Sequence, residues 1–262
     1  MMASPFDPIL DNIISAGYHN QRKEGHSDAL VRQIVKDLDT HCEAFAIDRK
    51  AGVIREWLNE KAFDGRTTDL LIGAADDNGR PDLRNVRIII ENKSVITAHR
   101  NKNARFQDIE REMRASHANN PLTIVVATLI IGTCQRYLNV ADNRKKDPRL
   151  EPGQFESDVL ARLSTGDESL WLDFSKWISS NTKDDPSKTM EYFRRLPVRQ
   201  MADAHEVGLD FMLFIPMAID NVTPPSLATL DGLDPSASYW EMITHICQLY
   251  QFRWHRRQQR KP

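Results

Sequence analysis

Three ionisable residues stand at the ends of two apolar segments that are expected to pair as strands. Asp69 begins the segment TDLLIGA, while Glu91 and Lys93 follow the β-branched run Val86–Ile90. Turn-forming residues separate the two segments, so the pattern predicts an antiparallel hairpin over residues 68–93. The start of one strand of such a hairpin lies beside the end of the other. Because side chains alternate along a strand, Glu91 and Lys93 share a face and lie near Asp69.

Two carboxylates and an amine at the end of a buried strand suit the metal-assisted hydrolysis of a phosphodiester. The oxygens of Asp69 and Glu91 are ligands that Mg²⁺ prefers, and Mn²⁺ is expected to substitute for it. A cation held there would polarise the phosphate and lower the pKa of a bound water. Lys93 would orient that water or stabilise negative charge on phosphorus. The backbone carbonyl of Asn92 is a further candidate metal ligand.

On these residues the sequence resembles the PD-(D/E)xK nuclease superfamily, which includes many restriction endonucleases. The matching segments are TTDLLIG, which contains Asp69, and RIIIENKS, which contains Glu91, Asn92 and Lys93. The resemblance covers roughly residues 25–135. It implies a restriction-endonuclease-like core in which Asp69 and Glu91 bind metal and Lys93 is catalytic.

The sequence departs from the family pattern in the residue before the aspartate, and it contains two competing motifs. Thr68, not proline, precedes Asp69. A literal Pro81-Asp82 pair occurs in the predicted turn and would serve only if that turn were shorter. The triplet Asp48-Arg49-Lys50 follows a short apolar segment, residues 44–47, that we interpret as a strand. It ranks lower because no earlier strand supplies it with a carboxylate.

Two further residues occupy positions that some members of the superfamily use. Asp28 is the best candidate for an acidic residue on an upstream helix, with Glu24 as the second choice. Gln107 fits the position of a glutamine on the helix after the lysine strand. Each residue also has a simpler interpretation. A carboxylate in the first turn, such as Asp28, stabilises a helix through its dipole, and Gln107 suits a solvated helix face.

A group of basic residues follows the proposed active strand. Its members are Arg100, Lys102, Arg105, Arg111 and Arg114. The formal net charge of the whole chain is -2, so binding of a polyanion would need a local patch of this kind. Contacts with DNA phosphates would supply affinity that does not depend on base sequence. A solvated helix face, shared with Glu110 and Glu112, explains the same pattern.

The order of the expected elements predicts the fold class. Helices are expected over residues 5–16 and 27–38, followed by the hairpin, a helix over 104–117 and a buried strand over 122–131. A strand over 211–218 and a helix over 239–254 follow. The pattern of segment 53–63 does not distinguish a strand from a helix. This order predicts an α/β or α+β fold with a central mixed sheet flanked by helices. We interpret residues 1–262 as a single domain with its core at about 25–135 and a C-terminal extension from about 139.

Cysteine usage and hydropathy bear on the compartment. Cys42, Cys134 and Cys247 lie far apart in sequence, which favours a reducing cytoplasm. The N-terminal segment lacks the pattern of a signal peptide. The longest nearly apolar run, residues 122–132, is shorter than the roughly 20 residues that cross a bilayer. These observations predict a cytoplasmic protein without a membrane partner.

The preferred hypothesis is a Mg²⁺-dependent endonuclease that cuts DNA, in restriction or antiphage defence. Cutting both strands of a duplex favours a homodimer. One alternative is a defence nuclease activated by a small nucleotide effector, a cyclic oligonucleotide, bound within residues 139–235. The other is a catalytically inactive DNA-binding or interaction module on the same fold.

Overall fold

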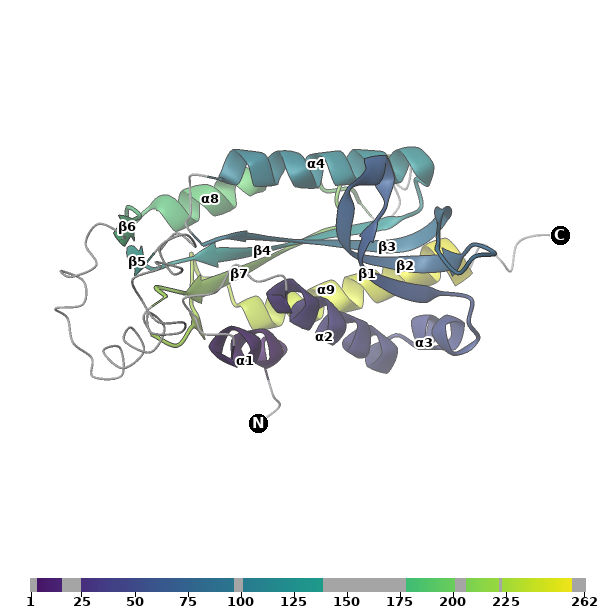
Figure 1. The fold of residues 1–262 in the computed structure, drawn as a ribbon, viewed down its shortest axis with the longest axis horizontal. Helices are drawn as coiled ribbons and strands as arrows, with labels where there is room; N and C mark the ends of the chain where they lie inside the picture. Colours follow the sequence, from purple (N-terminus) through teal and green to yellow (C-terminus); the bar gives the residue numbers. More distant parts are fainter. Residues whose placement is uncertain are drawn as a thin grey trace, which may run out of the picture.

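The computed structural model describes residues 4–15, 25–96, 101–138, 178–200, 206–221 and 223–255. Its centre is a six-stranded sheet in the order β1-β2-β3-β4-β7-β8 (Figure 1). The strands are β1 (Arg55–Lys61), β2 (Thr67–Ala75), β3 (Pro81–Val95), β4 (Ile124–Gly132), β7 (Phe211–Ala218) and β8 (Ser226–Leu227). β3, β4 and β7 run parallel, and the other neighbours pair antiparallel. The predicted mixed sheet is confirmed.

Helices cover both faces of this sheet (Figure 1). On one face lie α1 (Asp7–Ser15), α2 (Gly25–His41), α3 (Glu43–Lys50) and α9 (Pro235–Tyr250). On the other lie α4 (Lys102–Asn119) and α8 (Asp185–Phe193). Smaller elements are the 3₁₀ turn η2 (Phe63–Gly65), the π-helical turn η4 (Gln251–His255), and a separate two-stranded sheet of β5 (Arg136–Leu138) and β6 (Ile178–Ser180).

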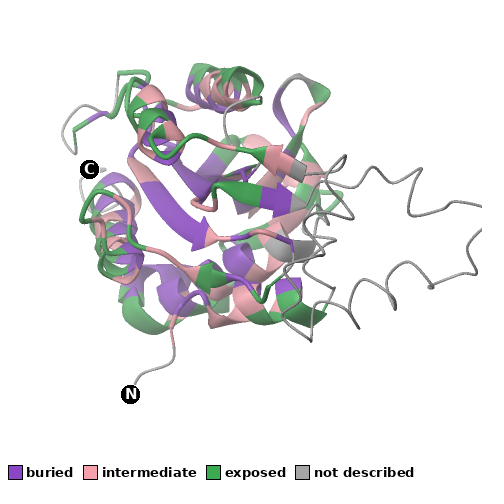
Figure 2. Cartoon of the chain, turned by 90° about the vertical axis from the view of Figure 1, so that its left-hand side faces the viewer, coloured by how far each residue is buried: buried purple, intermediate pink, exposed green. Residues whose placement is uncertain are grey.

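The central strand β4 shows why the sheet is covered on both faces. Its sequence, IVVATLIIG, is buried along its whole length, as expected for a parallel strand between two helical layers. Ile124 and Val126 belong to the core cluster shared with α2 and α9, while Val125 and Ala127 belong to the cluster shared with α4. Figure 2 shows the buried strands enclosed by helices whose outer surfaces are exposed.

The expected strand over residues 44–47 is wrong, because this segment lies in α3. Ala44, Phe45 and Asp48 are buried, whereas Ile47 is 53% exposed, which is the spacing of a helix. A run of four apolar residues does not distinguish a strand from a helix by itself. The ambiguous segment after it contains the edge strand β1.

The C-terminal part of the chain contributes to the same core. β7 pairs with β4, and α9 packs within the large hydrophobic cluster. The fold also joins Cys42 and Cys247 in a disulfide across 205 residues of sequence. The prediction of a cytoplasmic protein therefore loses the support taken from cysteine spacing. Within the described residues, every helix is too short or too polar to cross a membrane.

Candidate active site

The pairing of β2 with β3 ends beside the three predicted site residues Asp69, Glu91 and Lys93. This antiparallel pairing ends at Leu70↔Ile90, and Oδ2 of Asp69 accepts a hydrogen bond of 2.8 Å from the backbone N–H of Asn92. The carboxylate thus takes the place of a main-chain acceptor. β1 is irregular at the same level, because Asn59 has a φ of 51°. Residues other than glycine rarely adopt this left-handed conformation. The sheet is therefore irregular on both sides of Asp69, in β1 and at the end of its pairing with β3.

Asp69, Glu91 and Lys93 lie together, as the hairpin geometry predicts. The Lys93 Nζ is 3.9 Å from Oδ2 of Asp69 and in direct contact with Oε1 of Glu91. All three side chains are largely buried, with the Glu91 side chain only 7% exposed. A single ammonium group therefore lies beside two carboxylates in a shielded position and can balance the charge of only one of them. The catalytic roles of the three residues stay a prediction.

Burial strongly perturbs both carboxylates. Burial raises the pKa of Glu91, the charge of Lys93 opposes this rise and the charge of Asp69 adds to it, so that the pKa is about 8. Burial also raises the pKa of Asp69, against the lowering effects of Lys93 and the Asn92 N–H. The Oε2 of Glu91 is buried and, with both carboxylates ionised, has no hydrogen-bond partner among the described residues, whereas a protonated Glu91 can donate a hydrogen bond to Asp69. Such perturbed groups are frequent at functional sites.

The side chain of Asn92 points away from the carboxylates. Its Nδ2 is 3.5 Å from the carbonyl of Ser27 in α2, and its Oδ1 accepts a hydrogen bond from the Thr128 hydroxyl. A metal contact by this residue would have to come from the backbone carbonyl, as predicted. Asp28, the proposed fourth acid, accepts a hydrogen bond of 2.8 Å from Asn59. The structure thus ties Asp28 to the distorted part of β1.

Helix α4 presents a different residue from the one that the sequence indicated. Gln107 is exposed, whereas Glu112 is 4% exposed and its Oε1 accepts a hydrogen bond of 2.5 Å from Thr68. The alternative that placed Glu112 on a solvated helix face is therefore wrong. Its position in the buried stripe, three residues after Ile109 and beside Met113, was the signal that could have identified it.

The predicted basic group is partly occupied by local contacts. The Lys102 Nζ lies 5.3 Å from the ring centre of Tyr192, and Arg105 is 3.5 Å from Asp108. Arg111 is exposed, and Arg100 lies outside the described residues. Sequence reasoning missed Arg66, which forms an ion pair of 2.6 Å with Asp108 and whose positive charge interacts with Glu112 and Glu91.

The two competing motifs lie elsewhere. Pro81 and Asp82 begin β3 instead of lying in the turn, and the Asp82 carboxylate accepts hydrogen bonds from Arg84 and Asn85. Asp48 lies in α3 and accepts a hydrogen bond of 2.8 Å from Tyr250. Neither motif supplies a carboxylate to the site at Asp69.

The donor atoms at the site suit a hard divalent cation. Asp69 and Glu91 offer carboxylate oxygens, and the unpartnered Oε2 of Glu91 is a buried acceptor that a cation would satisfy. Within the part of the chain that the structure describes, no group of three or more His, Cys, Asp or Glu side chains is arranged to hold a metal. The side-chain ligands for such a cation would therefore be this pair, with the Asn92 carbonyl and water or substrate oxygens completing the coordination.

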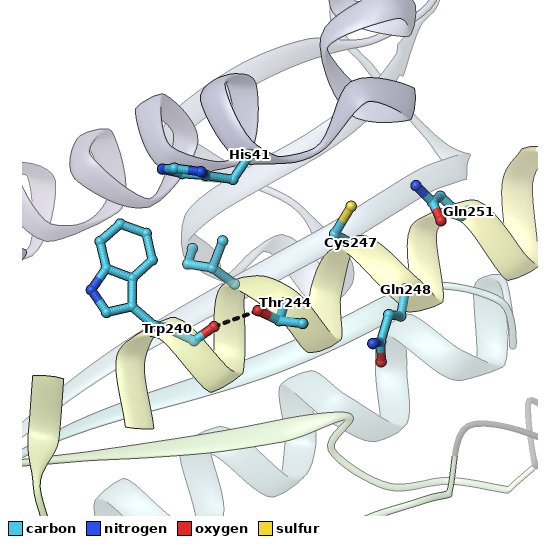
Figure 3. Close-up of a pocket in the computed structure, with 7 residues that line it drawn as sticks. His41, Trp240, Thr244, Cys247, Gln248 and Gln251 are labelled. Carbon is cyan, nitrogen blue, oxygen red and sulfur yellow. Dashed lines mark hydrogen bonds between the residues drawn. The ribbon is translucent and has the colours of Figure 1, made fainter. Parts of the chain in front are cut away.

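A separate pocket of about 430 Å³ opens between the end of α2 and α9 (Figure 3). Its lining residues are His41, Trp240, Ile243, Thr244, Cys247, Gln248 and Gln251. The rings of His41 and Trp240 meet edge to face, with centres 5.2 Å apart. None of the predicted site residues lines this pocket, so it is distinct from the carboxylate pair.

Comparisons of the chain with protein-family models, with curated proteins and with solved structures gave no significant match.

Proposed function

We propose that this chain is a Mg²⁺-dependent endonuclease that hydrolyses phosphodiester bonds in DNA. One observation carries the proposal. At the point where β2 and β3 part, two buried carboxylates, Asp69 and Glu91, share a single ammonium group, and an oxygen of Glu91 is left without a partner. Two buried carboxylates cannot both ionise favourably beside one ammonium group, so we infer that a cation binds there during function.

The side chains divide the chemistry between them. Asp69 and Glu91 would hold Mg²⁺ or Mn²⁺, which would supply charge neutralisation at the phosphate and a more acidic water. With Glu91 bound to a cation, the Lys93 ammonium group would stabilise the negative charge that develops on phosphorus. Burial of the three residues strengthens these interactions, because few water molecules screen them.

The test is the cleavage of supercoiled plasmid DNA by the purified protein, with Mg²⁺, with Mn²⁺ and with EDTA. The wild type is expected to cut only with metal. Asp69→Asn, Glu91→Gln and Lys93→Ala are each expected to abolish cutting while circular dichroism shows an intact fold. Lys188→Ala is the matched control, because this lysine is 61% exposed on α8 and should cut normally. Full activity in Glu91→Gln would overturn the assignment.

We also propose the partners and the biological setting. The substrate is DNA, and a homodimer would place one active site on each strand. Restriction or antiphage defence is the setting that suits such an enzyme. Arg111 on α4 is exposed, and it is the member of the basic group that we propose for a phosphate contact. Light scattering, with and without DNA, measures the subunit number.

A second candidate is a catalytically inactive DNA-binding module. It is favoured by the direct contact between Lys93 and Glu91, which neutralises the carboxylate without a metal. Tight DNA binding without metal-dependent cutting would identify it. For an effector-activated nuclease, much of the proposed effector region, residues 139–177, lies outside the described residues.

A further inference from the structure

A buried hydrogen bond links the residue before Asp69 to helix α4. Thr68 and Glu112 are 0% and 4% exposed, and their side-chain oxygens are 2.5 Å apart. The bond joins positions 44 residues apart in sequence. It is therefore a tertiary contact inside the protein, beside the point where β2 leaves β3.

This bond accompanies a break in the alternation of β2. In a regular strand, residues 68 and 70 would point to the same face of the sheet. Leu70 lies instead in the core cluster shared with α2, whereas the Thr68 hydroxyl reaches α4 on the opposite face. The backbone between them carries Asp69, whose carboxylate accepts the Asn92 N–H. The direction of the Asp69 side chain thus depends on where Thr68 is held.

We propose that Glu112 is a positioning residue, which acts through Thr68 to keep the Asp69 carboxylate beside Asn92 and Lys93. The hydroxyl of Thr68 is the link, and it occupies the position before the aspartate. A structural role alone would require only that Glu112 and Thr68 satisfy each other as buried polar groups. The positioning role requires in addition that loss of the Thr68–Glu112 hydrogen bond weaken the hydrogen bond from the Asn92 N–H to Asp69.

The first test measures the hydrogen exchange of the Asn92 amide in metal-free protein by NMR, so it needs no enzymatic activity. In Thr68→Val, which keeps the shape but loses the hydroxyl, Asn92 exchange is expected to rise roughly tenfold, the order expected when one hydrogen bond is lost. Amides of Leu70 and Ile88 should stay protected. Thr68→Ser keeps the hydroxyl and should restore slow exchange.

Variants of Glu112 separate the hydrogen bond from the charge. Glu112→Gln keeps an acceptor for Thr68 and should leave Asn92 protected, whereas Glu112→Leu should behave like Thr68→Val. Glu110→Gln is the control on the same helix, because Glu110 pairs with Arg114 at the surface. Unchanged Asn92 exchange in Thr68→Val, or an equal rise at every core amide, would overturn the proposal.

The second test measures plasmid cleavage and rests on the proposed nuclease function. Thr68→Val and Glu112→Leu are expected to lower kcat about 10–100-fold, as is usual for groups that hold metal ligands in place. Glu112→Gln should retain most of the activity. Without cutting by the wild type, the nuclease proposal fails, while the Asn92 exchange still decides the positioning role. Normal kcat in Thr68→Val, with an active wild type, would count against that role.

Discussion

Two clusters of buried charge in this protein, one at Asp210 and one at Glu91, shift the pKa of their carboxyl groups in opposite directions. Asp210 is paired with two arginines, Arg199 at 2.8 Å and Arg253 at 2.6 Å. It also accepts a hydrogen bond of 2.9 Å from the Val125 N–H. Burial raises the pKa of Asp210, but the two arginines outweigh burial and lower the pKa below its ordinary value.

Glu91 is almost as deeply buried but shares a single cation, Lys93, with Asp69. Its pKa is raised to about 8, chiefly by burial, and its Oε2 has no hydrogen-bond partner among the described residues. A buried charge with complete partners is typical of structural networks, whereas an incompletely paired one is typical of sites that bind or react.

The surroundings of Asp210 agree with a structural role. Arg199 also donates to the carbonyls of Pro121 and Thr123, which precede β4, and Arg253 belongs to the turn η4 after α9. The cluster therefore joins the start of β4, the residue before β7 and the end of the described chain. Its charges hold segments together that are distant in sequence.

The largest effect is expected from breaking the complete cluster. Asp210→Asn leaves two buried arginines without an anionic partner, which should lower the free energy of unfolding by about 3–5 kcal/mol. Urea denaturation followed by tryptophan fluorescence measures this loss. A loss of under about 1 kcal/mol, the range of an exposed ion pair, would show that the cluster is less important to the fold than its burial indicates.

A smaller effect on stability is expected at Glu91, where the neutral form of the carboxyl group, and not the anion as at Asp210, favours the folded state. Its pKa is raised in the fold, so the protonated form favours folding. The resulting stability is complete below about pH 4.5 and is lost as pH rises toward about pH 8. In EDTA, the wild type should lose stability on the order of a few kcal/mol between about pH 5 and about pH 8.

Glu91→Gln cannot ionise and should lose much less stability over the same interval. Urea titrations at both pH values compare the two proteins. If the free energy of unfolding depended on pH equally in the two proteins, Glu91 would be ionised in the folded protein at neutral pH. Glu91 would then resemble Asp210, which would contradict the contrast between the two clusters.

The smallest of these effects is expected at His117, beside the complete cluster. Burial, reinforced by the charge of Arg199, lowers the pKa of His117 to about 4. Its contribution to stability is present above about pH 6.5 and is lost as pH falls through about pH 4, with a total of roughly 3 kcal/mol. His117→Gln should flatten this acid branch, as thermal unfolding at several pH values would show. An unchanged acid branch in the variant would assign it to other groups.

The sequence was sufficient for the hairpin and for the three residues that it brings together. β2 and β3 carry strong, local signals, namely apolar β-branched runs around a dense turn, and side-chain alternation then places Glu91 and Lys93 on one face. The wholly apolar β4 was equally clear. These features depend on neighbours in sequence, so one chain is enough to predict them.

Features that depend on tertiary contacts could not be predicted in this way. Glutamate is a residue type that usually lies on the solvated face of a helix, and only the contact of Glu112 with Thr68 shows that Glu112 is buried. The pairing of Asp210 with Arg199 and Arg253, and the disulfide of Cys42 with Cys247, join segments that periodicity does not relate. Residues 44–47 failed because a short apolar run fits a helix as well as a strand.

The most direct test of the difference between the clusters is the calorimetric titration of Mn²⁺ into the metal-free protein. The wild type is expected to bind one Mn²⁺ per chain at the incompletely paired site, and Asp69→Asn and Glu91→Gln should weaken that binding at least about tenfold. Asp184→Asn, a change at a carboxylate that is 71% exposed, should bind as the wild type does. Equal Mn²⁺ binding by the wild type and Glu91→Gln, or no binding by either, would contradict the account.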